Sequence, residues 1–334
     1  MTAALGCAPT SPSVPAIEFS GSCQPAYQQV RDVWESRIRA LGLTGAGLLV
    51  RSKGETRCEL YAGEITASTA VPLVSAAKWV SATAILAAIE ANGLALTDSV
   101  GRFFPNAAAD ARTIRIRQLL SHTSGLPAYQ PCMFDRNLTL RQCAETILSQ
   151  TLDAPPGAGF AYGGAAFTVA GAVAERASGK VWADLFRDRI AGPLGMSAAA
   201  TYGSTKNPVL SEGEVRASVR DYGKFLQMLL DGGVTAGHVV LSPASVEAMR
   251  RNQSESLPII VSPRGQMSYG LGAWREAEGP DGLATVMSSP GAGGFIPMID
   301  FTNQLLVVFA AFDDINREFP VYQAVVAAVR EVER

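Results

Sequence analysis

Strand-like segments occur only near the two ends of this 334-residue chain. Near the N-terminus, residues 45–51 and 57–63 have the pattern of two strands joined by a short turn. Near the C-terminus the strand-like segments are residues 284–289, 294–300 and 304–312. Apolar residues recur at helical spacing in residues 25–41 and 320–332. We therefore predict an α+β fold in which both chain ends form one antiparallel sheet flanked by terminal helices.

The middle of the chain, from about Leu94 to Ser262, is dominated by helical patterns between Gly- and Pro-rich loops. Its clearest helical segments are residues 164–177, 181–190, 219–230 and 244–251. Another helix begins near Ser75 and ends at Asn92-Gly93. A mainly helical domain is therefore inserted between the two parts of the sheet. The expected divisions are a disordered leader or signal remnant at 1–22, a sheet domain at 23–66 and 268–334, and a helical domain at 67–267 that carries Ser75.

Composition excludes several classes of protein. Hydrophobic residues make up 48% of the chain and charged residues 17%, which is typical of a globular protein and not of a disordered one. The formal net charge of -2 gives no electrostatic reason to expect a nucleic-acid partner. The sequence contains no run of eighteen apolar residues, so we predict no transmembrane helix.

The first residues, M-T-A-A-L-G-C-A, resemble the end of a bacterial lipoprotein signal, in which Cys7 would become the lipidated first residue. The basic start of such a signal is absent and the apolar stretch is short. A start placed inside a longer signal would explain both departures. The alternative is a disordered leader with an incidental cysteine. Membrane attachment through a lipidated Cys7 and a periplasmic location are therefore expectations, with a cytoplasmic protein as the alternative.

The other four cysteines bear on the same question. Cys132 and Cys143 lie close in sequence, Cys23 precedes the first helix, and Cys58 lies on a predicted strand. One lipidated cysteine and two disulfides, Cys132–Cys143 and Cys23–Cys58, would account for all five in an oxidising periplasm. Five unrelated thiols in a cytosolic enzyme are the alternative. No Cys-x-x-Cys or Cys/His spacing indicates a metal site.

Ser75-Ala76-Ala77-Lys78 opens a predicted helix, and residues three apart lie on the same helical face. A serine hydroxyl is a poor nucleophile, and a neighbouring amine can accept its proton. The helix N-terminus adds partial positive charge at the same place. This pattern is weak by itself, because serine is a favoured N-cap and lysine is common on solvated helix faces. The catalytic interpretation needs further segments.

Those segments are present in order. Arg117-Gln118-Leu119-Leu120-Ser121-His122-Thr123-Ser124-Gly125-Leu126-Pro127 closely resembles a signature of the class C β-lactamases, D-alanyl-D-alanine peptidases and their esterase relatives, including the family VIII carboxylesterases. Further matching segments are residues 98–105, 193–196, 221–233 and 269–272. The resemblance covers roughly residues 30–330. It implies a β-lactamase/penicillin-binding-protein-like fold with Ser75 as the nucleophile and Lys78 as the group that activates it.

The family's second motif is Y-x-N, and Tyr162-Gly163-Gly164 stands at the expected place. The resemblance implies that Tyr162 shares proton transfer with Ser75 and Lys78. A core aromatic with a satisfied hydroxyl is the alternative. Gly164 replaces the asparagine, which removes an amide that the family uses to hold the substrate's amide group.

The third motif is K-T-G or H-x-G, and Ser289-Pro290-Gly291 occupies that place. Gly291 still allows the backbone to approach a substrate, whereas Pro290 removes a backbone donor. By resemblance, the oxyanion-hole donors are the backbone N–H groups of Ser75 and Ala292. The substrate-binding set is therefore Gly164, Ser289, Pro290 and Gly291. The glycine-rich run that follows lacks the helix and lysine of a phosphate loop.

The two histidines do not support a Ser-His-Asp triad. His122 belongs to the signature segment and is expected to be a hydrogen-bonded structural residue, and His238 has no evident partner. The sequence also lacks a G-x-S-x-G elbow. Neither a metal nor an organic cofactor is implied.

Three functions stay open at this point. The first is a carboxylesterase or broad acyl hydrolase, and the second is a β-lactamase or D-amino-acid peptidase. The substrate in either case is a small ester, amide or β-lactam. The third is a non-catalytic member of the fold that binds cell wall or a partner, which the two altered motifs favour and the intact Ser75, Lys78 and Tyr162 oppose.

Overall fold

The computed structural model describes residues 17–202, 206–212, 215–254 and 256–334. Cys7, the proposed lipidation site, lies outside the described residues.

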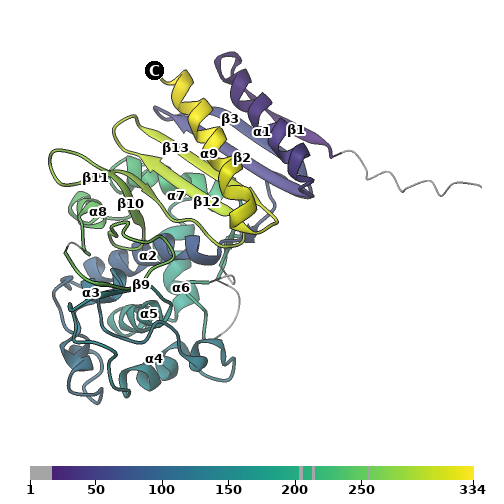
Figure 1. Cartoon of the computed structure of the whole chain (residues 1–334). Helices are drawn as coiled ribbons and strands as arrows, with labels where there is room; N and C mark the ends of the chain where they lie inside the picture. The colour runs from purple at the N-terminus through teal and green to yellow at the C-terminus, as the bar shows by residue number, and fades with distance from the viewer. Residues whose placement is uncertain (1–16, 203–205, 213–214, 255) are drawn as a thin grey trace, which may run out of the picture.

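One antiparallel sheet joins the two ends of the chain (Figure 1). In the described residues it has seven strands in the order β1-β3-β2-β13-β12-β11-β10. Their bounds are β1 (Phe19–Cys23), β2 (Gly45–Ser52), β3 (Glu55–Gly63), β10 (Trp274–Glu278), β11 (Ala284–Ser288), β12 (Phe295–Asp300) and β13 (Leu305–Ala311). The two halves meet where β13 pairs with β2. The predicted sheet from both chain ends is confirmed.

Two terminal helices cover one face of this sheet (Figure 1). They are α1 (Gln28–Leu41), which follows the short 3₁₀ turn η1 (Pro25–Tyr27), and α9 (Ile315–Val332). Trp34 and Ile38 of α1 and Val325 of α9 are fully buried in the core that these helices share with the strands. Helix α1 ends at Gly42, whose φ of 63° is the left-handed conformation that favours glycine at a helix end.

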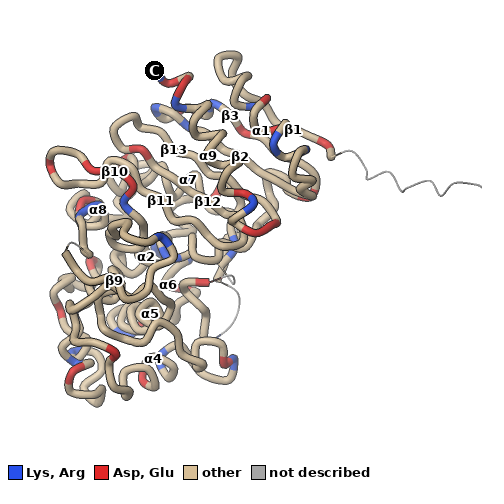
Figure 2. Tube along the Cα trace, in the orientation of Figure 1, with Lys and Arg blue, Asp and Glu red and all other residues tan. Residues whose placement is uncertain are grey.

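The opposite face packs against α7 (Val219–Leu230). This close approach depends on Gly223, where a Cβ atom would overlap the side chain of Leu49. Helix α7 lies within residues 67–267, the predicted helical domain, but it packs on the sheet. The boundaries of that domain at residues 67 and 267 therefore remain a prediction. Charged residues of both signs are interspersed along both parts of the chain (Figure 2).

Helix α2 (Ala77–Ala91) crosses the interior and is buried on nearly every face. It follows the 3₁₀ turn η2 (Val74–Ala76). Among the described residues, Val74–Ala91 is the one helical segment long and apolar enough to cross a membrane, but 78% of it is buried inside the protein. A core helix has the same composition.

The other elements complete the helical region. Its helical segments are η3 (Val100–Arg102), η4 (Ala111–Thr113), α3 (Ile116–Leu120), η5 (Pro131–Phe134), α4 (Leu140–Leu148), α5 (Ala165–Ser178), α6 (Trp182–Phe186), the π-helical turn η6 (Arg187–Ala191) and α8 (Pro243–Arg250). Its short strand pairs are β4 (Val71–Pro72) with β6 (Arg216–Ala217), β5 (Phe160–Ala161) with β9 (Ile259–Val261), and β7 (Val234–Thr235) with β8 (His238–Val239).

The structure corrects the sequence analysis at both ends. The disordered leader was expected to reach residue 22, but Phe19–Cys23 forms edge strand β1 against β3. Its sequence, FSGSC, is too polar to show a strand pattern, and pairing with β3 is what orders it. Helix α9 begins at Ile315 and not near Pro320, because the side chain of Asp314 caps it by accepting from the Asn316 N–H.

Both expected disulfides are present. Cys23 and Cys58 lie opposite each other on β1 and β3 with their Cα atoms 4.0 Å apart. Cys132 and Cys143 join η5 to α4 with a Cα separation of 5.3 Å. Neither separation exceeds the roughly 7 Å beyond which two cysteines cannot be bridged. The predicted pairing is confirmed.

Candidate active site

Ser75 lies in η2, just before α2 begins. The preceding residue, Val74, has a φ of 47°. A β-branched side chain in this left-handed region is strained, and such strain persists only where the surroundings impose it. One restraint lies just before Val74: the Leu73 N–H donates to the Val215 carbonyl at 2.8 Å. Ser75 is thus held at the positive end of a buried helix.

Lys78 lies one turn along α2 and is fully buried. Its Nζ donates to Ser75 Oγ at 3.2 Å and to the Ser211 carbonyl oxygen at 3.0 Å. The amine therefore contacts the hydroxyl that it would activate, and a backbone oxygen from a distant loop orients it.

Tyr162 follows strand β5 and is buried. Its ring stacks on Trp274 with centroids 5.2 Å apart, and Lys78 Nζ lies 4.5 Å from the centroid of the Tyr162 ring. Within the described residues its hydroxyl makes no hydrogen bond to Ser75 or Lys78. The structure therefore places the ring of Tyr162, and not its hydroxyl, in contact with Lys78. Catalytic hydrogen bonds often tighten only when substrate binds.

His122 is buried among the rings of Phe160, Tyr162, Phe167 and Tyr269. Its Nδ1 accepts from the Gly163 N–H at 3.4 Å. Burial, and then the neighbouring Lys78 side chain, lowers the pKa of His122 well below its usual value. This neutral imidazole supports the backbone beside Tyr162, as expected of a structural residue.

We call Ser75, Lys78, Tyr162 and Ser211 the helical wall, and residues 289–294 the strand wall. The two walls are in direct contact. Ser289 Oγ donates to the Ser75 carbonyl at 3.3 Å. A Cβ atom at Gly291 would overlap the carbonyl oxygen of Leu73. Gly291 is therefore required for the backbones to approach this closely.

Ala292 lies at the tip of the strand wall. Its carbonyl accepts from the Ile315 N–H at 3.1 Å, and the turn is closed by the Gly294 N–H, which donates to the Gly291 carbonyl at 3.0 Å. The Ala292 N–H donates to no other group in the part of the chain that the structure describes. It is free to donate to a substrate.

At Gly164, where the family has asparagine, side chains from other segments occupy the space next to the backbone. A Cβ atom there would overlap Met133 Cε and lie 2.6 Å from Ser211 Oγ. The Ser211 hydroxyl is buried and has no hydrogen-bond partner in the described residues. The position that the first side-chain carbon of the missing asparagine would take is thus occupied by a thioether and a hydroxyl.

A cleft of about 680 Å³ opens between the walls. It is lined by Ser75, Tyr129, Tyr162, Val261, Ser262, Pro263, Arg264, Trp274, Pro290, Ala292, Ile315, Asn316, Phe319 and Pro320. Of the predicted site residues, four line the cleft: Ser75, Tyr162, Pro290 and Ala292. Lys78 lies behind Ser75, Ser289 and Gly291 join the two walls without lining the cleft, and Gly164 does not line it either. Rings and aliphatic side chains give the cleft a largely apolar surface.

Arg264 is a charged residue in this lining. Its guanidinium donates to Glu276 at 3.1 Å and to Ser288 Oγ at 2.9 Å, and Ser288 donates to Glu276. The Arg264 charge is therefore compensated by a carboxylate. Arg317, in the first turn of α9, pairs with Asp313 and donates to the Leu41 carbonyl at 3.0 Å.

Sequence reasoning missed several residues of the site. Trp274 lies on β10, a strand that was not predicted, and Ser211 and Phe319 come from segments with no motif of their own. Trp274 follows the matched segment 269–272 closely, which is the only signal that could have indicated it.

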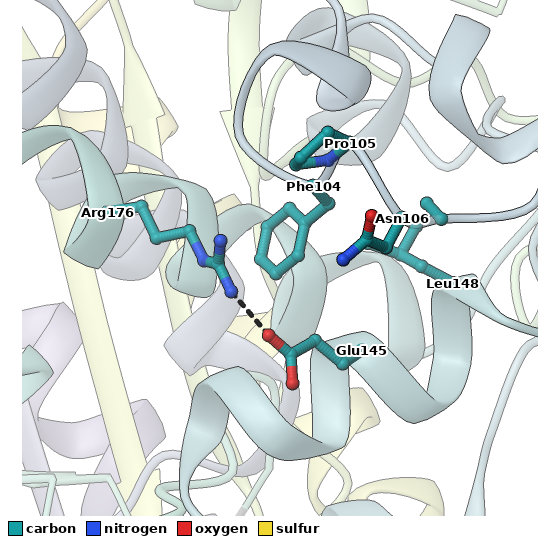
Figure 3. A pocket seen from close by; sticks show the side chains of 7 residues that line it. Phe104, Pro105, Asn106, Glu145, Leu148 and Arg176 are labelled. Carbon is teal, nitrogen blue, oxygen red and sulfur yellow. Dashed lines mark hydrogen bonds and ion pairs between the residues drawn. The ribbon is translucent and has the colours of Figure 1, made fainter.

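A second cavity of about 300 Å³ lies in the helical region (Figure 3). Arg176 forms an ion pair with Glu145, donates to the Phe103 carbonyl at 2.7 Å, and lies 4.2 Å from the centre of the Phe104 ring. Because these groups already satisfy one another, we assign this cavity no ligand.

Comparison with known proteins agrees with this geometry. A family model described as Beta-lactamase matches residues 30–311. Penicillin-binding protein 4 of Amycolatopsis lactamdurans is 28% identical over 263 residues, which cover 65% of this chain and 69% of that protein. Esterase EstB of Burkholderia gladioli is 28% identical over 214 residues, which cover 56% of this chain and 54% of that protein.

A solved structure of a β-lactamase candidate from Bacteroides dorei DSM 17855 superposes with a TM-score of 0.80 at 28% identity, covering 93% of this chain and 99% of that one. The resemblance and the fold predicted from the sequence are thereby confirmed. The chain belongs to the Beta-lactamase family of serine hydrolases.

Proposed function

We propose that this protein is a carboxylesterase or broad acyl hydrolase that works through an acyl-enzyme on Ser75. The observation that carries the proposal is the 3.2 Å contact between Lys78 Nζ and Ser75 Oγ at the floor of an open, largely apolar cleft. This contact also argues against a purely binding function, which has no need of a buried lysine beside a serine.

The proposed reaction has two halves. Ser75 Oγ attacks the carbonyl carbon while its proton passes to Lys78, and the N–H groups of Ser75 and Ala292 stabilise the oxyanion. When the ester bond breaks, the leaving alkoxide takes that proton, with Tyr162 sharing the transfer. Water then attacks the acyl-enzyme, gives one proton to Lys78, and releases the acid as Ser75 regains its hydrogen.

The cleft favours neutral esters over β-lactams. A β-lactam carries a carboxylate and a side-chain amide that an enzyme must hold. Here Pro290 offers no donor, Gly164 is covered, and Arg264 is already paired with Glu276. A charge-assisted hydrogen bond contributes about 1.5–3 kcal/mol and a neutral one about 1 kcal/mol. Lacking both costs about two to three decades in kcat/KM.

Kinetics on p-nitrophenyl butyrate and nitrocefin, with Ser75→Ala as the control, tests this proposal. We expect kcat/KM for the ester to exceed that for nitrocefin by about 10²–10³-fold, and intact mass spectrometry to show acylation that Ser75→Ala abolishes. No acylation of Ser75 by any ester, D-amino-acid amide or β-lactam would overturn it in favour of a binding protein.

β-Lactamase or D-amino-acid peptidase activity is the second candidate, and Arg264 is the observation that favours it. A substrate carboxylate could displace Glu276 from the Arg264 guanidinium, since the two anions are of the same kind. A kcat/KM for nitrocefin equal to or above that for the ester would make this the function.

We also propose export to an oxidising compartment, the periplasm, on the support of the two disulfides, since structural disulfides are rare in the cytosol. Attachment through Cys7 would add membrane anchoring. Globomycin treatment of expressing cells and mass analysis of the N-terminus test the lipid, and free thiols in freshly extracted protein would contradict the location.

A further inference from the structure

Glu318 is a buried acid that the proposed reaction does not use. It lies in the first turns of α9 and has no exposed surface. Neither of its carboxyl oxygens has a hydrogen-bond partner in the described residues. A buried polar group without a partner is costly, so its position calls for a reason.

The carboxyl group lies directly behind the strand wall. A Cβ atom at Gly294 would overlap both its carbon and its oxygens, so Glu318 fills the space that a side chain at Gly294 would take. Gly294 has a φ of 83° and closes the turn through its N–H, while its carbonyl accepts from the Ala311 N–H at 3.2 Å. The carboxyl group is therefore packed against the turn that carries Ala292.

The same helix end is tied to Ala292 itself. The Ile315 N–H donates to the Ala292 carbonyl at 3.1 Å, one turn of helix before Glu318. A displacement of the first turn of α9 would thus move the Ala292 peptide. Misplacement of a catalytic group by about 1 Å can cost about 10²-fold in rate.

We infer that Glu318 is a positioning residue: its carboxyl group fills the space behind Gly294 and holds the turn so that the Ala292 N–H stays at the cleft. This inference rests on the proposed acyl-transfer function, in which Ala292 is an oxyanion donor. Ionisation of Glu318 would place a charge without a donor behind the turn, and hydrating it requires the turn or the helix end to open.

Burial and two neighbouring acidic residues oppose the ionisation of Glu318. Burial, then the charges of Asp313 and Asp314, raises the pKa of Glu318 to about 8, against the charge of Arg317 and a contact with the Asp313 backbone amide that lies outside hydrogen-bond geometry. The facing elements, residues 291–295 and strand β13, contain no ionisable side chain. The group is therefore protonated at neutral pH and becomes charged in mildly alkaline solution.

The test compares wild type, Glu318→Gln and the control Glu331→Gln, an exposed position on the same helix. Glutamine keeps the shape and cannot ionise. The readout is the ratio of kcat/KM for p-nitrophenyl butyrate at pH 9 to that at pH 6.5, after subtraction of the uncatalysed rate. If the ionised form is inactive, this ratio should be about tenfold lower in wild type and Glu331→Gln than in Glu318→Gln.

A carboxyl ¹³C NMR titration of glutamate-labelled wild type, with the signal identified by its absence in Glu318→Gln, reports the ionisation without using activity. Equal pH ratios in all three proteins, or a Glu318 signal that titrates near its ordinary value in the folded protein, would overturn the inference and leave the proposed function standing. Failure of wild type to acylate Ser75 would overturn the proposed function, and this inference with it.

Discussion

The helical wall supplies the cleft with side chains, whereas the strand wall supplies it with backbone. On the helical wall, Lys78 is fixed by hydrogen bonds to Ser75 and to the Ser211 carbonyl. On the strand wall, the N–H of Ala292 is held by the Gly291–Gly294 turn contact, by the first turn of α9 and by the packing of Glu318.

This difference decides what a mutation can remove. A substitution deletes a side-chain group directly, so substitutions in the helical wall should lower activity by removing a reacting group. A backbone donor can only be displaced, so substitutions near the strand wall should lower activity by moving that donor. The size of this second effect should depend on the volume and charge of the groups behind the turn. The predictions that follow use this contrast, beginning with the largest effect.

Lys78→Ala should lower kcat by about 10²–10⁴-fold, because it removes the proton acceptor of Ser75. Lys78→Met, which fills more of the same buried space, should lose as much, so that packing is excluded as the cause. Exposed Lys180→Ala is the matched control and should keep its rate. Steady-state kinetics on folded protein, with circular dichroism as the fold check, decides this. Near-wild-type rates in either Lys78 variant would contradict the mechanism.

Gly291→Ala should lower kcat/KM by about 10²-fold, because the new methyl group overlaps the Leu73 carbonyl and forces the walls apart. Gly293→Ala is the control, since a Cβ atom there meets only Val74 Cγ2, at 3.2 Å. The comparison of the two variants on one ester is the measurement. Equal losses would mean that the strand wall is not sensitive to its distance from Leu73.

Glu318→Gln should stabilise the protein more at pH 7 than at pH 5. The folded carboxyl keeps its proton up to about pH 8, whereas the unfolded one loses it near its ordinary value of 4.5. Between these values unfolding releases a proton, so wild-type stability falls as pH rises, by about 1.4 kcal/mol per pH unit. The glutamine variant lacks this loss. Urea denaturation at both pH values measures it, and a difference that does not change with pH would refute it.

Gly164→Ala should cost about 1–2 kcal/mol of stability, because its methyl group meets Met133 and Ser211 in a filled space. Ser211→Ala in the same chain should relieve part of this cost, since the two groups touch, and a double-mutant cycle measures the coupling. Simple additivity of the two changes would show that Ser211 does not occupy the place of the missing amide.

The sequence by itself predicted the sheet formed by both chain ends, and it placed together Ser75 and Lys78, the pair to which the family resemblance assigns the reaction. Strand patterns confined to the chain ends predicted the sheet, and helical spacing placed Ser75 and Lys78 on one face of a helix. Both depend on local periodicity, which a chain carries in its own order of residues. The pairing Cys23–Cys58 was also predictable, but strand β1 was not, because FSGSC becomes ordered only against β3.

The tertiary structure alone decided how the site is completed. Sequence showed that asparagine is missing at position 164, but only the fold shows Met133 and Ser211 filling its place. Likewise, nothing in the local pattern of α9 indicates that Glu318 lies behind Gly294, or that Arg264 faces the cleft already paired with Glu276. These contacts join residues that are not neighbours in sequence, so no short-range sequence pattern predicts them. Burial and hydrogen-bond partners, which set the charge of Glu318 and the orientation of Lys78, exist only once the chain has folded.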